Sequence, residues 1–126
     1  MLFRSPPGSK AAFPPGSAHR WWNAGHELLR FEGRVSPVVD LDRFLQAMFD
    51  VANAGPDGRP SLFYMVHALH RHRKTQVAVV VPPALQRVLF PVVIALGRLL
   101  GKYRGTDWPG CPARCTGAPT ALAGEV

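Results

Sequence analysis

Five histidines and two cysteines are the side chains of this chain best suited to bind a metal or to act in catalysis. Imidazole binds divalent transition metals, and His19, which follows a Pro-x-Gly turn signal, is the candidate ligand. His26 lies beyond that segment, and the three histidines of 67–72 lack the i, i+4 spacing that places two ligands on one helical face. Cys111 and Cys115 alone do not complete a zinc site. One candidate metal ligand therefore remains, and we assign no catalytic residue.

His19 belongs to a set of regularly spaced residues, G-x5-P-x-G-x2-H-x3-N, that begins at Gly8 and ends at Asn23. Gly8 permits a tight turn in which a side chain would strain the backbone. Pro14 and Gly16 are turn formers that lead into the segment of His19, and the amide of Asn23 can close the turn that follows it. These residue types predict two short segments joined by a tight turn.

This motif resembles the second signature motif of the cupin superfamily, because Gly8, Pro14, Gly16, His19 and Asn23 fill all of its defining positions. The resemblance implies a jelly-roll β-barrel in which His19 points inward as one ligand of a divalent metal. In cupins, a first motif with two His and one Glu precedes the second, and only seven residues precede Gly8 here. The resemblance therefore implies a barrel that is incomplete at its N-terminus. His19 is then a lone ligand, and we expect no cofactor for this chain alone.

Trp21 and Trp22 follow His19 directly. Neighbouring residues on a strand face opposite sides, so one of the two would face the barrel interior. That side chain could line a small-molecule pocket or simply pack in the core, and the sequence leaves both readings open.

Residues 1–36 contain the turn signals of the motif and end in an alternating segment, Leu29 to Val35, which is typical of a strand with one buried face. We therefore predict an α+β fold, with short antiparallel strands of a partial cupin-type barrel in this region.

Residues 37–104 have apolar side chains at helical spacing and predict about three helices that pack on the barrel. The expected helices cover residues 41–52, 62–69 and 84–103. Pro91 lies inside the third pattern and should kink or split it. Residues 105–126 are rich in Gly, Pro, Ala and Thr without periodicity, and this composition predicts a disordered tail.

The chain is basic, with 15 Lys and Arg against 8 Asp and Glu, a net charge of +7. A basic chain can attract nucleic acid or anionic lipid. The arginines are scattered, however, and a nucleic-acid surface would combine a basic stripe with stacking aromatics, so we expect no nucleic-acid partner.

The segment 77–100 is apolar on average, but its longest apolar run, Val88 to Gly97, is about half of the ~20 residues that a membrane span needs. We expect a buried or amphipathic helix and no membrane partner, with docking on a membrane surface as the alternative. The start of the chain has no secretory signal, which indicates the cytoplasm.

Two functions follow from these observations. The leading hypothesis is a cupin domain-containing protein that binds a small molecule or a metal in its complete form and is not catalytic as this chain. A half-barrel exposes strand edges, so a homodimer or another partner would complete it. The alternative is a small basic interaction protein whose helices dock on a partner, a membrane surface or a polyanion.

Overall fold

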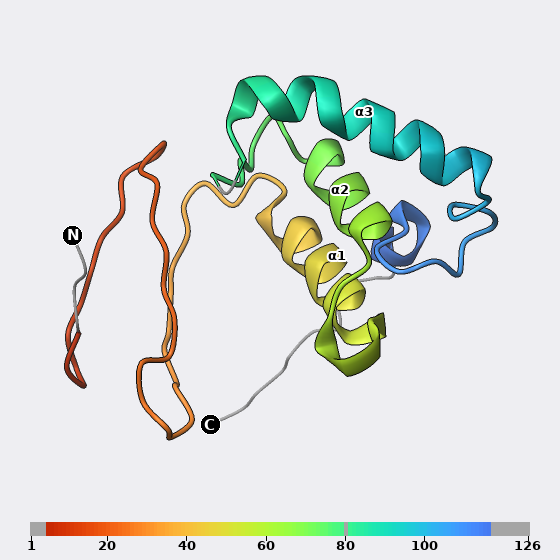
Figure 1. Cartoon of the computed structure of the whole chain (residues 1–126). Coiled ribbons are helices and arrows are strands. Elements are labelled where there is room, and N and C mark those ends of the chain that lie inside the picture. Colours follow the sequence, from red (N-terminus) through yellow and green to blue (C-terminus); the bar gives the residue numbers. More distant parts are fainter. Residues whose placement is uncertain (1–4, 80, 117–126) are drawn as a thin grey trace. The chain divides into compact units, whose positions relative to one another are not determined.

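The chain consists of two compact units, Met1–Arg34 and Val35–Val126. The computed structural model describes residues 5–79 and 81–116. Its helical elements belong to the second unit and are labelled in chain order in Figure 1. They are α1 (Leu41–Ala54), the short 3-10 helix η1 (Pro56–Gly58), α2 (Leu62–Arg71), α3 (Pro83–Leu99) and the 3-10 helix η2 (Pro112–Thr116).

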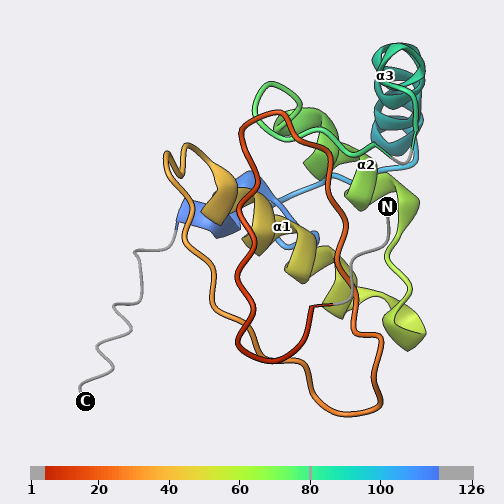
Figure 2. The ribbon, with the colours of Figure 1, turned by 90° about the vertical axis from the view of Figure 1, so that its left-hand side faces the viewer.

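The first unit has no β-strand among its described residues, 5–34, and Figure 2 shows it as turns and extended chain. The predictions of an α+β fold, a partial cupin-type β-barrel and a jelly roll are therefore wrong: the described part of the chain is helical. All residues of the alternating segment, Leu29 to Val35, are exposed, so neither face of the segment is covered. A strand needs a neighbour that bonds its backbone and covers one face, and alternation alone supplies neither.

Helix α1 begins after Asp40 and ends before Gly55, which confirms the helix predicted near 41–52. Ala47 and Val51, one turn apart, form its buried face. Gly55 ends the helix where the chain passes very close to itself, because a Cβ at this position would collide with the backbone of Arg59. The loop containing η1 then leads into α2.

Helices α2 and α3 pack on each other around a core of Val66, Phe90 and Ile94, all of which are buried. Phe90 and Ile94 lie four residues apart, so they share the face of α3 that meets α2. Helix α2 also packs on α1 and therefore lies between the other two helices, as Figure 1 shows. The helical periodicity of 62–69 and 84–103 is thus confirmed.

Pro91 lies inside α3, and the helix continues through it as one element from Pro83 to Leu99. The proline ring removes the N–H that would donate to the Arg87 carbonyl, one turn earlier. Because Pro91 is exposed, water can bond that carbonyl. The helix is therefore not split.

Residues 105–116, which the sequence assigns to a disordered tail, carry buried side chains in the structure. Trp108 and Cys111 are both buried, and Cys111 is a free thiol. The side chain of Cys115 and residues 117–126 lie outside the described residues. Two side chains of this Gly- and Pro-rich segment therefore belong to the buried part of the second unit.

Gly110 ties the same segment to two helices through its backbone. Its N–H donates to Asp50 Oδ2 of α1 at 2.6 Å, and its carbonyl accepts from Arg71 Nη1 of α2 at 3.0 Å. Gly110 has φ +74°, and a Cβ there would lie 3.0 Å from Val51 Cγ2. Glycine therefore fits this position both by conformation and by space.

Gly97 marks a close approach between α3 and Tyr103, and it predicts a strong effect of a larger residue. A Cβ on Gly97 would lie 2.7 Å from the Tyr103 ring. The Tyr103 hydroxyl donates to the Phe63 carbonyl at 2.8 Å, so the ring cannot move aside without losing this bond. We expect Gly97→Val to lower the free energy of unfolding by about 1–3 kcal/mol, measured by urea unfolding.

Ala95→Val is the matched control for this prediction, because Ala95 lies on the exposed side of the same helix. Its effect should stay within about 0.5 kcal/mol. An equal loss of stability in both variants would show that helix propensity, and not the contact with Tyr103, limits position 97.

Candidate functional site

The motif residues of the first unit form tight turns, as their types predict. The Ser17 N–H donates to the Pro14 carbonyl at 3.1 Å, and Gly16 between them has φ +77°. Gly8, with φ +80°, has the same left-handed conformation in the preceding turn. Both glycines therefore have a backbone conformation that residues with a side chain rarely adopt.

His19 is exposed and makes contacts only with near neighbours in the described structure. Its Nδ1 lies 2.9 Å from the Ser17 carbonyl oxygen, and its ring stacks on Phe13 with the centroids 4.4 Å apart. Within residues 5–79 and 81–116, no three His, Cys, Asp or Glu side chains gather in a way that could hold a metal ion. The structure therefore brings no such group to His19.

Asn23 closes the turn that follows it, as expected. Its Oδ1 accepts from the Gly25 N–H at 3.0 Å, and its Nδ2 donates to the Glu27 carbonyl at 2.6 Å.

Trp21 and Trp22 are 62% and 50% exposed. With no sheet among the described residues, neither tryptophan faces the interior of a barrel.

The second unit contains an aromatic cluster around His67, one of the three histidines whose spacing in the sequence does not suit a metal site. The His67 ring lies 4.8 Å from the rings of both Tyr103 and Trp108, and Tyr64 stacks on Trp108 at 6.0 Å. The cluster joins α2 to the segment after α3. It encloses His67 on one side and leaves its Nδ1 buried without a hydrogen-bond partner in the described structure.

This environment holds His67 in the neutral form. Burial, followed by the charges of Arg71, Arg98 and His70, lowers the pKa of His67 to about 4. The three groups act together because they lie on the facing sides of α2 and α3. His67 is thus a half-buried imidazole in a positive potential.

The lowered pKa of His67 predicts that the protein loses stability as the pH falls below 6.5, which is the ordinary pKa of a histidine. The unfolded chain takes up a proton near pH 6.5, whereas the folded protein does so only near pH 4. Within this window the unfolded state binds more protons, so acid favours unfolding. From pH 7 to pH 5, the free energy of unfolding should fall by at most about 2 kcal/mol.

Urea unfolding at the two pH values measures this change, and His67→Leu should remove the part that belongs to His67. Burial and then the charge of Arg73 lower the pKa of His70 as well, so His70 adds a contribution of the same sign that remains in this variant. The pKa of Asp40 is also lowered, by hydrogen bonds from Thr75 and then His72, but it titrates below 3.8 and leaves the window unaffected. His19→Leu, at an exposed position, is the control. An unchanged pH dependence in His67→Leu would refute the assignment.

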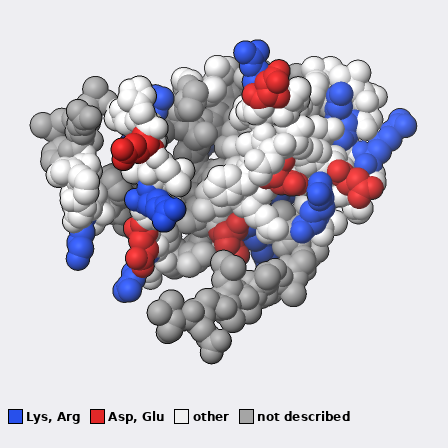
Figure 3. Space-filling view, turned by 90° about the horizontal axis from the view of Figure 1, so that it is seen from below, with Lys and Arg blue, Asp and Glu red and all other residues white. Residues whose placement is uncertain are grey.

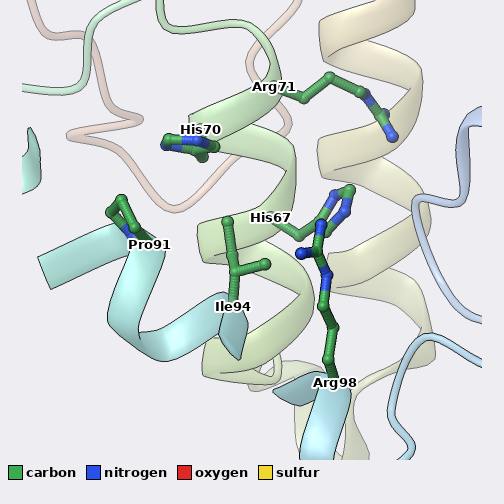
Figure 4. A pocket seen from close by; sticks show the side chains of 6 residues that line it. All are labelled: His67, His70, Arg71, Pro91, Ile94 and Arg98. Carbon is green, nitrogen blue, oxygen red and sulfur yellow. The ribbon is translucent and has the colours of Figure 1, made fainter. Parts of the chain in front are cut away.

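A hollow of about 310 Å³ lies between α2 and α3 beside His67. Its lining residues are His67, His70 and Arg71 of α2 and Pro91, Ile94 and Arg98 of α3. Figure 4 shows Arg98 reaching from α3 toward the imidazole of His67, with Ile94 at the centre and His70 on the side of Pro91. Two of the six residues are arginines and none is acidic, so the hollow has a positive lining with a small apolar floor.

His72 follows these lining residues directly in the sequence but does not line the hollow, and it pairs with Asp40 before α1. Its Nδ1 lies 2.5 Å from Asp40 Oδ2, and its ring packs edge-on against Phe44 at 5.6 Å. This pair ties the start of α1 to the end of α2. The histidines of 67–72 therefore divide between two roles: His67 and His70 line the hollow, and His72 joins two helices.

The side of α3 that points away from α2 is a wide apolar surface. Its large side chains are between 42% and 82% exposed, and we call them the outer face: Leu85, Val88, Leu89, Val92, Leu96 and Leu99. With 3.6 residues per turn, these positions fall on one side of the helix, opposite the buried Phe90, Ile94 and Gly97. No helix of the described structure is long and apolar enough to cross a membrane.

The segment of sequence that contains this surface carries charge of one sign. Residues 58–106 contain no Asp or Glu, and they contain eight Lys and Arg. These are Arg59, Arg71, Arg73, Lys74, Arg87, Arg98, Lys102 and Arg104. On the face that Figure 3 shows, acidic side chains lie beside basic ones, so the absence of acidic residues is a property of the segment 58–106 and not of the whole surface.

Two signals in the sequence could have identified these features: the acid-free stretch 58–106 and the apolar residues of 84–103, which are too many for one packed face. The proximity of His67 to Arg98 depends on how α2 and α3 pack, and no local pattern indicates it. Comparison with protein-family models, with curated proteins and with solved structures finds no match for this chain.

Proposed function

We propose that the second unit is a small basic interaction module that docks on an anionic membrane surface through the outer face of α3. The observation that carries this proposal is the exposure of six large aliphatic side chains on one side of α3, in a segment that has no acidic residue. A contiguous exposed apolar surface on a folded protein marks a site that another apolar surface covers.

The breadth of the apolar surface favours lipid over a single partner helix. Leu85, Leu89, Val92, Leu96 and Leu99 alternate in spacings of four and three, as in a coiled-coil seam. The flanking positions that would select a partner helix by charge are Gln86 and Val93 on one side and Val88 and Ala95 on the other, and none of them is charged. The exposed surface is therefore wider than a seam, and it lacks the charges that specify one.

The sign of the charge favours an anionic surface. Each Lys or Arg near an anionic bilayer contributes about 1 kcal/mol, and the apolar side chains add the free energy of leaving water. A second copy of this chain would instead bring a further acid-free segment with the same eight positive charges. The cytoplasmic leaflet carries the anionic lipids, so the proposal places the protein in the cytoplasm.

Co-sedimentation of the full chain with vesicles tests this proposal. We expect binding to vesicles of phosphatidylcholine mixed with phosphatidylglycerol and much weaker binding to phosphatidylcholine alone. High salt should weaken the binding, because it screens the attraction between Arg or Lys and the lipid phosphates. Equal binding to both vesicles, or none to either, would contradict the proposal; in the second case, dimer formation by sedimentation would point to a second copy as the occupant.

A further inference from the structure

We propose that the hollow between α2 and α3 binds a phosphate group, with Arg98, His67 and His70 as its direct contacts. The site lies beside the outer face and does not belong to it. Arg98 and Pro91 lie on the flank of α3 between the outer face and the side buried against α2. A group in the hollow would therefore lie next to whatever covers the outer face.

The charges around the hollow favour an anion. Arg71 and Arg98 line the hollow from α2 and α3, and the charge of each lowers the pKa of His67, so both guanidinium groups act on the same space between the helices. None of the six lining residues is an Asp or Glu that would offset these charges. An anion in the hollow would relieve this repulsion.

The types of the lining side chains favour phosphate among anions. The guanidinium of Arg98 has a planar fork of N–H donors that fits two oxygens of a phosphate. Neutral His67 and His70 can each donate one N–H to a third oxygen. Arg71 already donates to the Gly110 carbonyl at 3.0 Å, so its part in this site is the charge it adds.

The hollow has the size for such a group. Its volume of about 310 Å³ corresponds to the share of about ten water molecules in the liquid, which leaves room for a phosphate with part of its hydration shell. Pro91 and Ile94 form an apolar wall that suits the carbon atoms attached to a phosphate ester. A phosphomonoester or the phosphate of a lipid headgroup shares this chemistry.

A titration of the full chain with inorganic phosphate, followed by NMR of the histidine imidazoles, tests the site. We expect saturable shifts of the His67 and His70 signals that sodium chloride at equal ionic strength does not produce. Bound phosphate should raise the pKa of His67, because an anion stabilises the protonated imidazole. Arg98→Gln should weaken the binding about tenfold or more.

Arg87→Gln is the matched control, because Arg87 is exposed on the same helix and does not line the hollow. Its phosphate affinity should equal that of the wild type. Absence of saturable shifts in the wild type would overturn the proposal. So would equal weakening in Arg87→Gln and Arg98→Gln, which would indicate general attraction by the net positive charge.

Vesicle binding by the same variants distinguishes the two sources of phosphate. If Arg98→Gln weakens vesicle binding more than Arg87→Gln does, the site holds a lipid headgroup. If both variants bind vesicles equally while only Arg98→Gln loses inorganic phosphate, the site holds a free phosphomonoester. The phosphate site and the docking proposal fail separately: saturable phosphate binding without vesicle binding would remove only the docking.

Discussion

The double substitution Val92→Asp and Leu96→Asp is expected to abolish binding to anionic vesicles while leaving the protein folded. Both residues belong to the outer face, about half of each side chain is exposed, and they lie one turn apart. Each substitution removes an aliphatic side chain whose burial is worth about 1.5–3 kcal/mol, and it adds a carboxylate that anionic lipid repels. Together they should lower the affinity at least about a hundredfold, measured by co-sedimentation.

The control for this variant is Leu45→Asp, because Leu45 is a similarly exposed leucine on α1. It adds a negative charge without changing the outer face, so the affinity should fall only by the effect of that charge. Circular dichroism should show the helical content of the wild type in both variants. If Leu45→Asp weakens binding as much as the double substitution, net charge alone governs the attachment and the outer face has no part in it.

The substitution Phe90→Ala is expected to have the largest effect on stability. Phe90 is buried between α2 and α3, where it contacts Val66 and Ile94 in the core cluster. Truncation of a buried phenylalanine costs about 3–5 kcal/mol, because it removes apolar contacts and leaves a cavity. Domains of this size have a total stability of about 5–15 kcal/mol, so this loss should greatly reduce the denaturant midpoint in urea unfolding.

Val88→Ala is the matched control on the same helix, because Val88 is exposed on the outer face. It should change the free energy of unfolding by about 0.5 kcal/mol or less in the absence of lipid. Similar losses for Phe90→Ala and Val88→Ala would mean that both sides of α3 are packed in solution. The outer face would then be covered by the protein itself or by a second copy.

The helices could be predicted from the sequence because their signal is local. Apolar spacing over 41–52, 62–69 and 84–103 indicates α1, α2 and α3, and Gly55 ends the first of them as its type suggests. The barrel could not be predicted correctly because a sheet depends on pairing between strands. The motif from Gly8 to Asn23 specifies turns, and turns form without any sheet beside them.

The docking surface and the hollow show a second limit of sequence patterns. Helix α3 is apolar on nearly all sides, so periodicity alone does not separate Phe90, which is buried, from Val92, which is exposed. Likewise, His67 and Arg98 are 31 positions apart, and only the packing of α2 on α3 places them at one hollow. The buried Trp108 follows the same rule, since its neighbours Tyr64 and His67 lie on α2.

The most direct test of the docking proposal is to measure which methyl groups approach lipid. The full chain, with methyl-labelled Leu and Val, is bound to phosphatidylglycerol nanodiscs that contain a lipid with a nitroxide on its acyl chain. The account predicts the strongest paramagnetic broadening for Val92 and Leu96, and little for Leu45 of α1 or the buried Val51. Uniform broadening, or broadening strongest at Leu45, would contradict the docking of the outer face on a membrane.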